Sequence, residues 1–315
     1  MLKGPIEMAS IRSRIVRELT HQYMKRQWIQ TGSDAGQGRK SVAAARRDFE
    51  RRMSLLPTAR DVRLEREQIA GVDCEWHVPK GCDGSPLIYY LHGGGFVVGG
   101  PSTHRRLVSH IASEAKMRAI VPDYRLSPEN PFPAALDDSL KVWRGLRSRG
   151  EDSMRMVIGG DSAGGNLSVG TILSLRDAGE ELPKACFLMS PWLDLAGEGE
   201  SYETRLTDDP WFRPEQMKAV AARYCGASEL RKPLVSPVYA DMAGFPSTLI
   251  QVGNDEILLS DSKRLADNID TSGGHVELNI YPKMWHVFQY FIGQMPESRE
   301  ALSEISQFLS LQVAN

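Results

Sequence analysis

Short apolar runs alternate with longer amphipathic stretches along most of this chain. The apolar runs predict six buried strands, at 86–91, 119–121, 156–158, 185–189, 248–252 and 276–280. Apolar residues at helical spacing predict five helices between and after them, at 104–116, 134–148, 163–176, 261–272 and 297–311. Two further strand-like segments, 61–70 and 72–78, meet at Gly71 and predict a hairpin. Strand, crossover helix and strand in repetition predict an α/β fold: a mostly parallel, eight-stranded sheet with helices on both faces.

Two regions depart from this alternation. Residues 8–30 carry apolar side chains at helical spacing, a turn is expected at 31–38, and a more charged helix is expected at 41–55, before Pro57. Residues 197–235 contain several aromatic residues and prolines but no clear buried strand. We therefore expect an N-terminal helical cap segment (1–58) and a helical cap insertion (197–235). They would fold over an α/β domain made of residues 59–196 and 236–315.

Composition excludes several classes of function. The 315 residues are 41% hydrophobic and 25% charged, with a formal net charge of −2, which is ordinary for a globular protein and gives no basic field for nucleic acid. Four cysteines, Cys74, Cys82, Cys186 and Cys225, have no metal-ligand spacing and are expected to be reduced thiols. No apolar run suits a signal peptide or a membrane span, so we expect a cytoplasmic protein that uses neither membrane nor nucleic acid.

The most informative motif follows the predicted strand at 156–158. The sequence Gly-Asp-Ser-Ala-Gly at 160–164 lies between that strand and the helix at 163–176. A nucleophilic serine on a sharp strand-to-helix turn needs small neighbours, and the start of the helix favours negative charge near it. Ser162 is therefore the expected nucleophile, with a simple glycine-containing turn as the alternative.

A second glycine-rich motif follows the predicted strand at 86–91. Residues 92–95 read His-Gly-Gly-Gly, and consecutive glycines let backbone N–H groups point into a cavity. Such donors stabilise the oxyanion of an acyl-transfer reaction. A phosphate-binding loop is the poorer interpretation, because neither a Gly-Lys-Ser/Thr motif nor a dinucleotide fingerprint is present.

A serine nucleophile needs a base, and the base needs an acid to orient it. Only His275 and His286 follow Ser162; His275 stands at a strand entrance and is expected to be a surface residue, which leaves His286. The acid is expected in the loop after the strand at 248–252. Asp255 is the preferred residue and its neighbour Glu256 the alternative, whereas Asp261 is expected to cap the next helix.

Together these motifs resemble the bacterial hormone-sensitive-lipase-like esterases (family IV) of the α/β-hydrolase superfamily. The resemblance covers about residue 61 to the C-terminus. It rests on HGGG at 92–95, GDSAGGN at 160–166, Asp255 and His286, with support from PDYRLSPE at 122–129, FPAA at 132–135 and SPWLD at 190–194. Where family members commonly have Asp-Pro-Leu after the acid position, this chain has Asp-Glu-Ile-Leu at 255–258.

The resemblance implies an α/β-hydrolase fold and a serine carboxylesterase that cleaves short- to medium-chain acyl esters through Ser162, His286 and Asp255. It further implies an oxyanion hole of the Gly94, Gly95 and Ala163 N–H groups, a structural role for His92, Arg125 and Glu129, no cofactor and no metal, a small-molecule ester as substrate, and a homodimer. We expect the substrate pocket to include aromatic residues, with core packing as the alternative for each: Phe96, Trp192, Trp211, Phe212 and Trp285.

Three other functions are consistent with parts of this pattern. A lactone or activated-amide hydrolase would use the same three side chains. A non-catalytic ligand-binding protein could share the fold, although loss of the histidine would then be expected. A chymotrypsin-like protease would have its histidine and aspartate before the serine, which is not the order in this chain.

Overall fold

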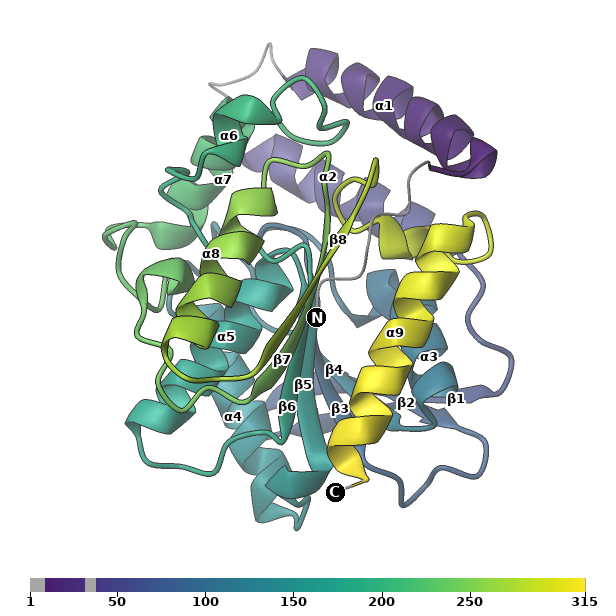
Figure 1. The fold of residues 1–315 in the computed structure, drawn as a ribbon, viewed down its shortest axis with the longest axis vertical. Helices are drawn as coiled ribbons and strands as arrows, with labels where there is room; N and C mark the ends of the chain where they lie inside the picture. Colours follow the sequence, from purple (N-terminus) through teal and green to yellow (C-terminus); the bar gives the residue numbers. More distant parts are fainter. Residues whose placement is uncertain (1–8, 32–37, 315) are drawn as a thin grey trace.

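The computed structural model describes residues 9–31 and 38–314, with side chains for residues 9–22 and 42–314. Eight strands form one sheet (Figure 1). They are β1 (Val62–Ile69), β2 (Val72–Pro79), β3 (Leu87–Leu91), β4 (Arg118–Pro122), β5 (Met156–Asp161), β6 (Ala185–Met189), β7 (Ser247–Gly253) and β8 (Val276–Tyr281). The eight expected strands are therefore confirmed, with ends that differ by a few residues.

The order of the strands locates the functional end of the sheet. Across the sheet the order is β1-β2-β4-β3-β5-β6-β7-β8. The pairs β1–β2 and β2–β4 are antiparallel and all other pairs are parallel. The chain runs from β3 outward to β4 and then returns to the other side of β3 to form β5. Such a reversal opens a crevice beyond the carboxyl ends of the two central strands, where α/β proteins bind their ligands.

Helices cover both faces of the sheet, as the sequence predicts (Figure 1). The helices are α1 (Ile11–Thr31), α2 (Gly38–Met53), α3 (Pro101–Ala115), α4 (Ala134–Ser148), α5 (Ala163–Asp177), α6 (Ser201–Thr204), α7 (Pro214–Cys225), α8 (Leu259–Thr271) and α9 (Pro296–Val313). Helices α4, α5 and α8 pack on one face, and α3 and α9 pack on the other.

Side-chain alternation along β3 separates two hydrophobic clusters. Leu87, Tyr89 and Leu91 belong to the cluster under α4, α5 and α8, whereas Ile88 and Tyr90 belong to the cluster under α3 and α9. Successive side chains of a strand point to opposite faces, so a strand buried on both faces is apolar throughout. This explains why the sequence shows continuous apolar runs at the central strands.

Helices α1, α2, α6 and α7 lie together at one end of the sheet (Figure 1). The expected helix at 8–30 is α1, although Met8 lies outside the described residues; the helix expected at 41–55 is α2. The turn expected at 31–38 falls mostly on residues outside the described part of the chain. The region 197–235 contains the short α6 and the longer α7, and no strand lies within it.

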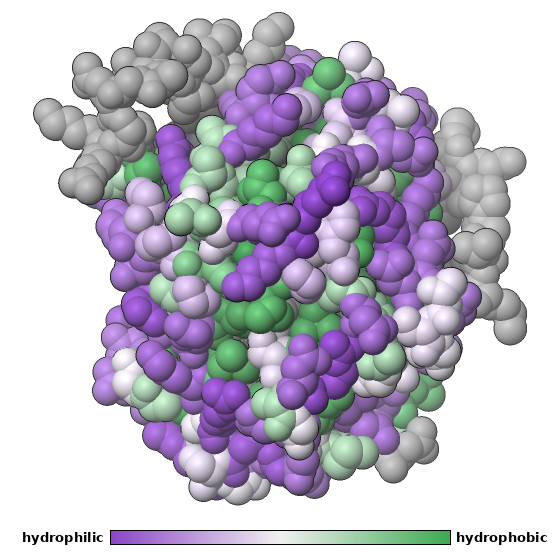
Figure 2. Space-filling view, turned by 90° about the vertical axis from the view of Figure 1, so that its left-hand side faces the viewer, coloured by the Kyte–Doolittle hydropathy of each residue, from purple (hydrophilic) through white to green (hydrophobic). Residues whose placement is uncertain are grey.

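The outer surface beside α6, α7 and α8 is largely hydrophilic, with smaller groups of apolar residues between the polar ones (Figure 2). A mixed surface of this kind is normal for a folded domain. Among the helices that the structure describes, none combines the length and the apolar character needed to cross a bilayer.

Candidate active site

Ser162 occupies a strained turn between β5 and α5. Its φ is +52° and its ψ is −121°, and the residue is 6% exposed. The turn brings the start of α5 against the loop after β3: a Cβ at Gly164 would lie 2.0 Å from the carbonyl O of Leu91. Only glycine fits at residue 164, so the sequence builds the sharp strand-to-helix turn on which a nucleophilic serine is presented.

The loop after β3 is equally constrained. Gly94 has a φ of +118°, and a Cβ there would lie 2.1 Å from the carbonyl O of Val98. Within the described part of the chain, the N–H groups of Gly94, Gly95 and Ala163 have no hydrogen-bond acceptor. Ala163 is the first residue of α5, where the helix leaves its first N–H groups unpaired. Free N–H groups at a helix start and on a glycine loop favour a developing negative charge.

A buried polar network supports this loop from below. The Asp161 carboxylate accepts hydrogen bonds from the hydroxyl of Tyr90 (2.6 Å) and the N–H of Gly93 (3.0 Å), and His104 Nε2 lies 3.4 Å away. Burial alone would raise the pKa of Asp161, but the adjacent imidazole of His104 and the hydrogen bonds hold it below its ordinary value. Asp161 therefore ties the glycine loop to the serine turn.

His92 belongs to the loop itself. Its ring stacks on Tyr124 with centroids 4.1 Å apart, its Nδ1 lies 2.8 Å from the Gly93 carbonyl, and the hydroxyl of Tyr124 donates to its carbonyl O. Burial lowers the pKa of His92 to about 3, so the imidazole stays neutral. These contacts suit a residue that shapes the loop, as the resemblance implies.

His286 lies in the loop that follows β8 and is 6% exposed. Its Nδ1 is 2.9 Å from Oε2 of Glu256, which is fully buried. Because a carboxylate can only accept, the proton sits on Nδ1 and the lone pair is left on Nε2, as a general base requires. His275 is largely exposed, with 63% of its side chain accessible, in agreement with the expected surface position.

The expected acid position needs a correction. Asp255 does not face His286; its carboxylate turns to α1, where Arg17 Nη1 lies 2.6 Å away. Adjacent residues of the loop point to different sides, and the glutamate is the one that turns inward. Asp261 is also not a helix cap: it lies in the first turn of α8 and accepts the N–H groups of Leu193 and Asp194.

Ser190 links the acid to both sides of the site. Its hydroxyl donates to Glu256 Oε1 (2.8 Å) and accepts the N–H of Val287 (3.1 Å), while the N–H of Gly253 also donates to Glu256 (2.7 Å). The preceding residue, Met189, accepts the N–H of Ser162 through its carbonyl (3.0 Å). The segments that carry Ser162 and His286 are therefore attached to two consecutive residues at the end of β6. Sequence reasoning did not identify Ser190 as part of the site.

Three side chains of the region 197–235 lie against groups of this site. The ring of Phe212 lies edge-on to the His286 imidazole, with centroids 4.6 Å apart. From α7, Tyr224 stacks on Phe96 at 3.6 Å, and Cγ1 of Val220 lies 3.0 Å from where a Cβ at Gly95 would be. These contacts help to bury the histidine and the glycine loop.

Asp209 attaches the segment with Trp211 and Phe212 to the loop that carries Glu256. Its carboxylate accepts the N–H groups of Trp211 (2.6 Å), Phe212 (3.0 Å) and Ile257 (2.9 Å). Burial raises the pKa of Asp209 to about 6, with a further contribution from the charge of Glu256, despite the three hydrogen bonds that favour the charged form. The sequence offers no motif that identifies this residue.

The aromatic residues expected to line the pocket have different surroundings. Phe96 and Trp192 are buried in the main core with rings 6.0 Å apart. Trp285 is buried in a third cluster, with Phe288 and Met295, against which Trp211 packs. Their part in substrate binding stays a prediction, and Phe212 is the aromatic residue that contacts His286.

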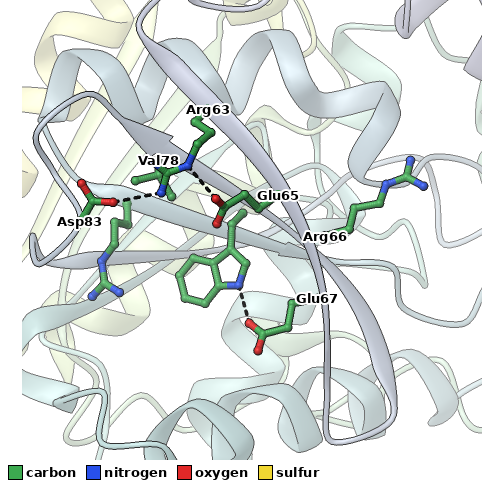
Figure 3. Close-up of a pocket in the computed structure, with 8 residues that line it drawn as sticks. Arg63, Glu65, Arg66, Glu67, Val78 and Asp83 are labelled. Atoms are coloured by element: carbon green, nitrogen blue, oxygen red, sulfur yellow. Dashed lines mark hydrogen bonds and ion pairs between the residues drawn. The ribbon is translucent and has the colours of Figure 1, made fainter.

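A separate surface hollow of about 680 Å³ lies on the β1–β2 hairpin (Figure 3). Within it, Arg63 pairs with Glu65 (2.7 Å) and Asp83 (3.0 Å), and Glu67 accepts from the Trp76 indole (2.9 Å). Arg118, which lines the hollow, is the first residue of β4, and β4 runs parallel to β3. The hollow therefore lies toward the amino ends of the parallel strands. Ser162 follows the carboxyl end of β5, and the hollow is therefore a different place from the candidate site.

Comparisons with known proteins agree with this architecture. A family model described as alpha/beta hydrolase fold matches residues 88–290. An acetyl-hydrolase of Streptomyces hygroscopicus is 38% identical over 235 residues, which are 75% of this chain and 78% of the relative. An esterase of Acinetobacter venetianus is 36% identical over 255 residues, 81% of this chain and 84% of the relative.

Solved structures extend the similarity to nearly the whole chain. The crystal structure of an esterase from the bacterial hormone-sensitive lipase family superposes with a TM-score of 0.89 at 37% identity, covering 97% of this chain and 99% of that one. The esterase EstE5, in a crystal soaked with p-nitrophenyl butyrate, superposes with a TM-score of 0.88 at 32% identity, covering 98% and 100%. With its eight-stranded mixed sheet and these relatives, the chain belongs to the hormone-sensitive-lipase family of carboxylic ester hydrolases on the α/β-hydrolase fold.

Proposed function

We propose that the protein hydrolyses short- to medium-chain acyl esters of small alcohols through an acyl-enzyme, with Ser162 as nucleophile, His286 as base and Glu256 as the orienting acid. One observation carries this proposal: the buried 2.9 Å contact between His286 Nδ1 and Glu256 Oε2, at the end of the sheet where Ser162 occupies its strained turn. The acid is thus the alternative to Asp255 that the sequence left open.

The first half of the reaction forms the acyl-enzyme. His286 Nε2 accepts the proton of the Ser162 hydroxyl as its oxygen attacks the ester carbonyl carbon, and Glu256 stabilises the resulting imidazolium. The carbonyl oxygen becomes an oxyanion, for which we propose the N–H groups of Gly94, Gly95 and Ala163 as donors. Collapse of the intermediate breaks the bond to the alcohol oxygen, which takes the proton from His286.

The second half releases the acid. A water molecule gives its proton to His286 Nε2 and attacks the acyl carbon, and the same three N–H groups stabilise the second oxyanion. The breakdown of that intermediate returns the proton to Ser162. Each donor is expected to lower the activation free energy, so that the loss of any one raises it by about 3 kcal/mol.

We propose that α1, α2, α6 and α7 act as a cap, made of the segments 1–58 and 197–235, over a catalytic domain made of 59–196 and 236–315. Phe212 on His286 and Val220 beside Gly95 support this division, because they cover the reacting groups from outside the sheet. A cap excludes water and strengthens the electrostatic interactions beneath it.

The substrate range is inferred from relatives and from the burial of the site. Ser162 and His286 are each 6% exposed, so the acyl and alcohol groups must fit beneath the cap. The relative soaked with p-nitrophenyl butyrate supports a small ester as the substrate. The four cysteines are free and buried, which supports the expected cytoplasmic location, and the family resemblance supports a homodimer.

The test is a series of p-nitrophenyl esters of increasing acyl length, measured on the wild-type protein and on Ser162→Ala. We expect highest kcat/KM at short to medium chains and a loss of at least about 10⁴-fold in kcat in the variant, whose circular dichroism stays unchanged. Lactones and anilides belong in the same assay. A folded Ser162→Ala protein with full activity, or a wild type that prefers lactones, would contradict the proposal.

A further inference from the structure

Arg17 bridges three separate parts of the chain. It projects from α1 and is about one quarter exposed. Its Nη1 donates to Asp255 Oδ2 (2.6 Å) and its Nη2 donates to the carbonyl O of Asp208 (2.7 Å). One guanidinium thus joins the N-terminal helix, the segment before Phe212 and the loop at 254–257, which we call the acid loop.

Asp255 depends on this contact. Its side chain is only 3% exposed, and a buried carboxylate is costly unless a positive charge and hydrogen bonds compensate it. The other groups near it are the Asn254 amide (3.1 Å) and the largely exposed ammonium of Lys283, 4.0 Å away. Among the side chains that the structure describes, Arg17 is the closest cation to Asp255 and the one with hydrogen-bond geometry, so its loss leaves a poorly compensated charge inside the acid loop.

The next residue in the acid loop is Glu256, the partner of His286. The backbone holds the loop from the other side, because the N–H of Asp255 donates to the carbonyl O of Met284, two residues before His286. A displacement of Asp255 therefore moves both the Glu256 carboxylate, which orients the histidine, and the loop after β8 that carries the histidine.

Helix α1 is docked over the same segment by independent contacts. Glu297, at the start of α9, accepts the N–H of Ser10 (2.7 Å) and the hydroxyl of Ser13 (3.2 Å). Val16 packs against the cluster that contains Trp285. Arg17 is the next residue, so the ion pair forms where α1 is already held against the neighbour of His286.

We propose that Arg17 and Asp255 are positioning residues for ester hydrolysis, an inference that rests on the proposed roles of Glu256 and His286. Their ion pair docks α1 on the acid loop and holds Glu256 at hydrogen-bonding distance from His286. Asp255, the residue that the sequence analysis prefers as the acid, acts instead through its neighbour Glu256.

The test combines steady-state kinetics on p-nitrophenyl butyrate with hydrogen exchange of α1. The variants are Arg17→Ala, Asp255→Asn and the double variant, with Arg14→Ala as the matched control, because Arg14 is an exposed arginine of the same helix. We expect each single variant to lose about tenfold in kcat, the double variant to lose no more than either single one, and exchange of residues 11–22 to rise in all three. Arg14→Ala should match the wild type in both measurements.

Three results would overturn the proposal. If Asp255→Asn lost more than about 10³-fold while Arg17→Ala kept its rate, Asp255 would be the acid itself. If both variants melted earlier with kcat unchanged, the pair would only stabilise the fold, and if the losses of the two variants multiplied, the residues would act separately. If Arg17→Ala does not fold, the double variant Arg17→Gln/Asp255→Asn removes the charge that Asp255 would otherwise keep without its partner. Its kcat and its hydrogen exchange are then compared with those of the wild type. Hydrogen exchange needs no turnover, so it tests the docking of α1 even if no ester is cleaved.

Discussion

Glu256 and His286 form a buried pair, whereas Asp255, one residue earlier, pairs with Arg17 on the N-terminal helix. Two adjacent carboxylates of one loop therefore have different partners on different sides. The one that contacts the imidazole is further held by the Ser190 hydroxyl and the Gly253 N–H, so both of its oxygens are in use. Such a carboxylate has one orientation available, which suits a group that must keep a histidine in a single tautomer.

Glu256→Gln should reduce kcat by about 10⁴-fold with little change in the fold. The amide can offer its N–H₂ to Nδ1, which favours the wrong tautomer of His286, and it carries no charge to stabilise the imidazolium. The measurement is kcat for p-nitrophenyl butyrate in Glu256→Gln and Asp255→Asn side by side. Equal losses in the two variants would remove the distinction between the acid and its neighbour.

Gly94→Ala should reduce kcat by roughly 10²-fold or more, because a Cβ would lie 2.1 Å from the Val98 carbonyl and the loop must move its N–H groups. The matched control is Gly71→Ala. Gly71 also has a positive φ, of +84°, but nothing lies within 4 Å of its added Cβ. We expect the control to lose about 1 kcal/mol of unfolding free energy and to keep its kcat. Normal turnover in Gly94→Ala would show that this loop is not the oxyanion site.

Unlike a carboxylate in an ion pair, Asp209 should make the protein more stable at acidic pH than at neutral pH. Its pKa of about 6 lies above the ordinary value of 3.8, so the folded state binds this proton more tightly than the unfolded state. The stabilisation is complete below about pH 4 and is lost as pH rises through 6, by at most about 3 kcal/mol. Urea unfolding of the wild type and of Asp209→Asn from pH 4.5 to 7.5 measures this difference. Parallel pH profiles for the two proteins would contradict it.

The fold follows from patterns that are local in the chain. The central strands are buried on both faces and read as apolar runs, and the β1–β2 hairpin turns at Gly71, so all eight strands could be predicted. The ends of the helices and strands are predicted less accurately than their existence. Helix α3 begins at Pro101, three residues before the expected start, because a proline in the first helical turn loses no hydrogen bond.

In the candidate site, too, some residues can be identified from local patterns and others cannot. Ser162, the glycine loop and His286 each stand at a strand end with a motif or an order in the chain that identifies them. The choice between Asp255 and Glu256 depends on which way each side chain of one loop turns, and Asp255 turns toward Arg17, more than 200 residues earlier in the chain. Ser190 and Asp209 each accept a hydrogen bond from a backbone N–H far along the chain, and such contacts leave no periodic or spaced signal in the sequence.

Ser190→Ala tests whether the link between the acid and the histidine segment matters for the reaction. The variant removes one acceptor from the Val287 N–H and one donor from Glu256, both of them buried, which should cost about 1–3 kcal/mol in unfolding free energy. With Glu256 less firmly held, we expect kcat to fall by about tenfold while KM stays within a factor of about two.

The control for this variant is Ser168→Ala. Ser168 is also fully buried, but its hydroxyl donates to the Gly164 carbonyl within α5, a bond that helix formation does not require. Its loss should leave kcat unchanged. If Ser190→Ala and Ser168→Ala behaved alike, the hydroxyl of Ser190 would be a packing feature, and the alignment of Glu256 would rest on the Gly253 N–H and the Arg17-anchored acid loop alone.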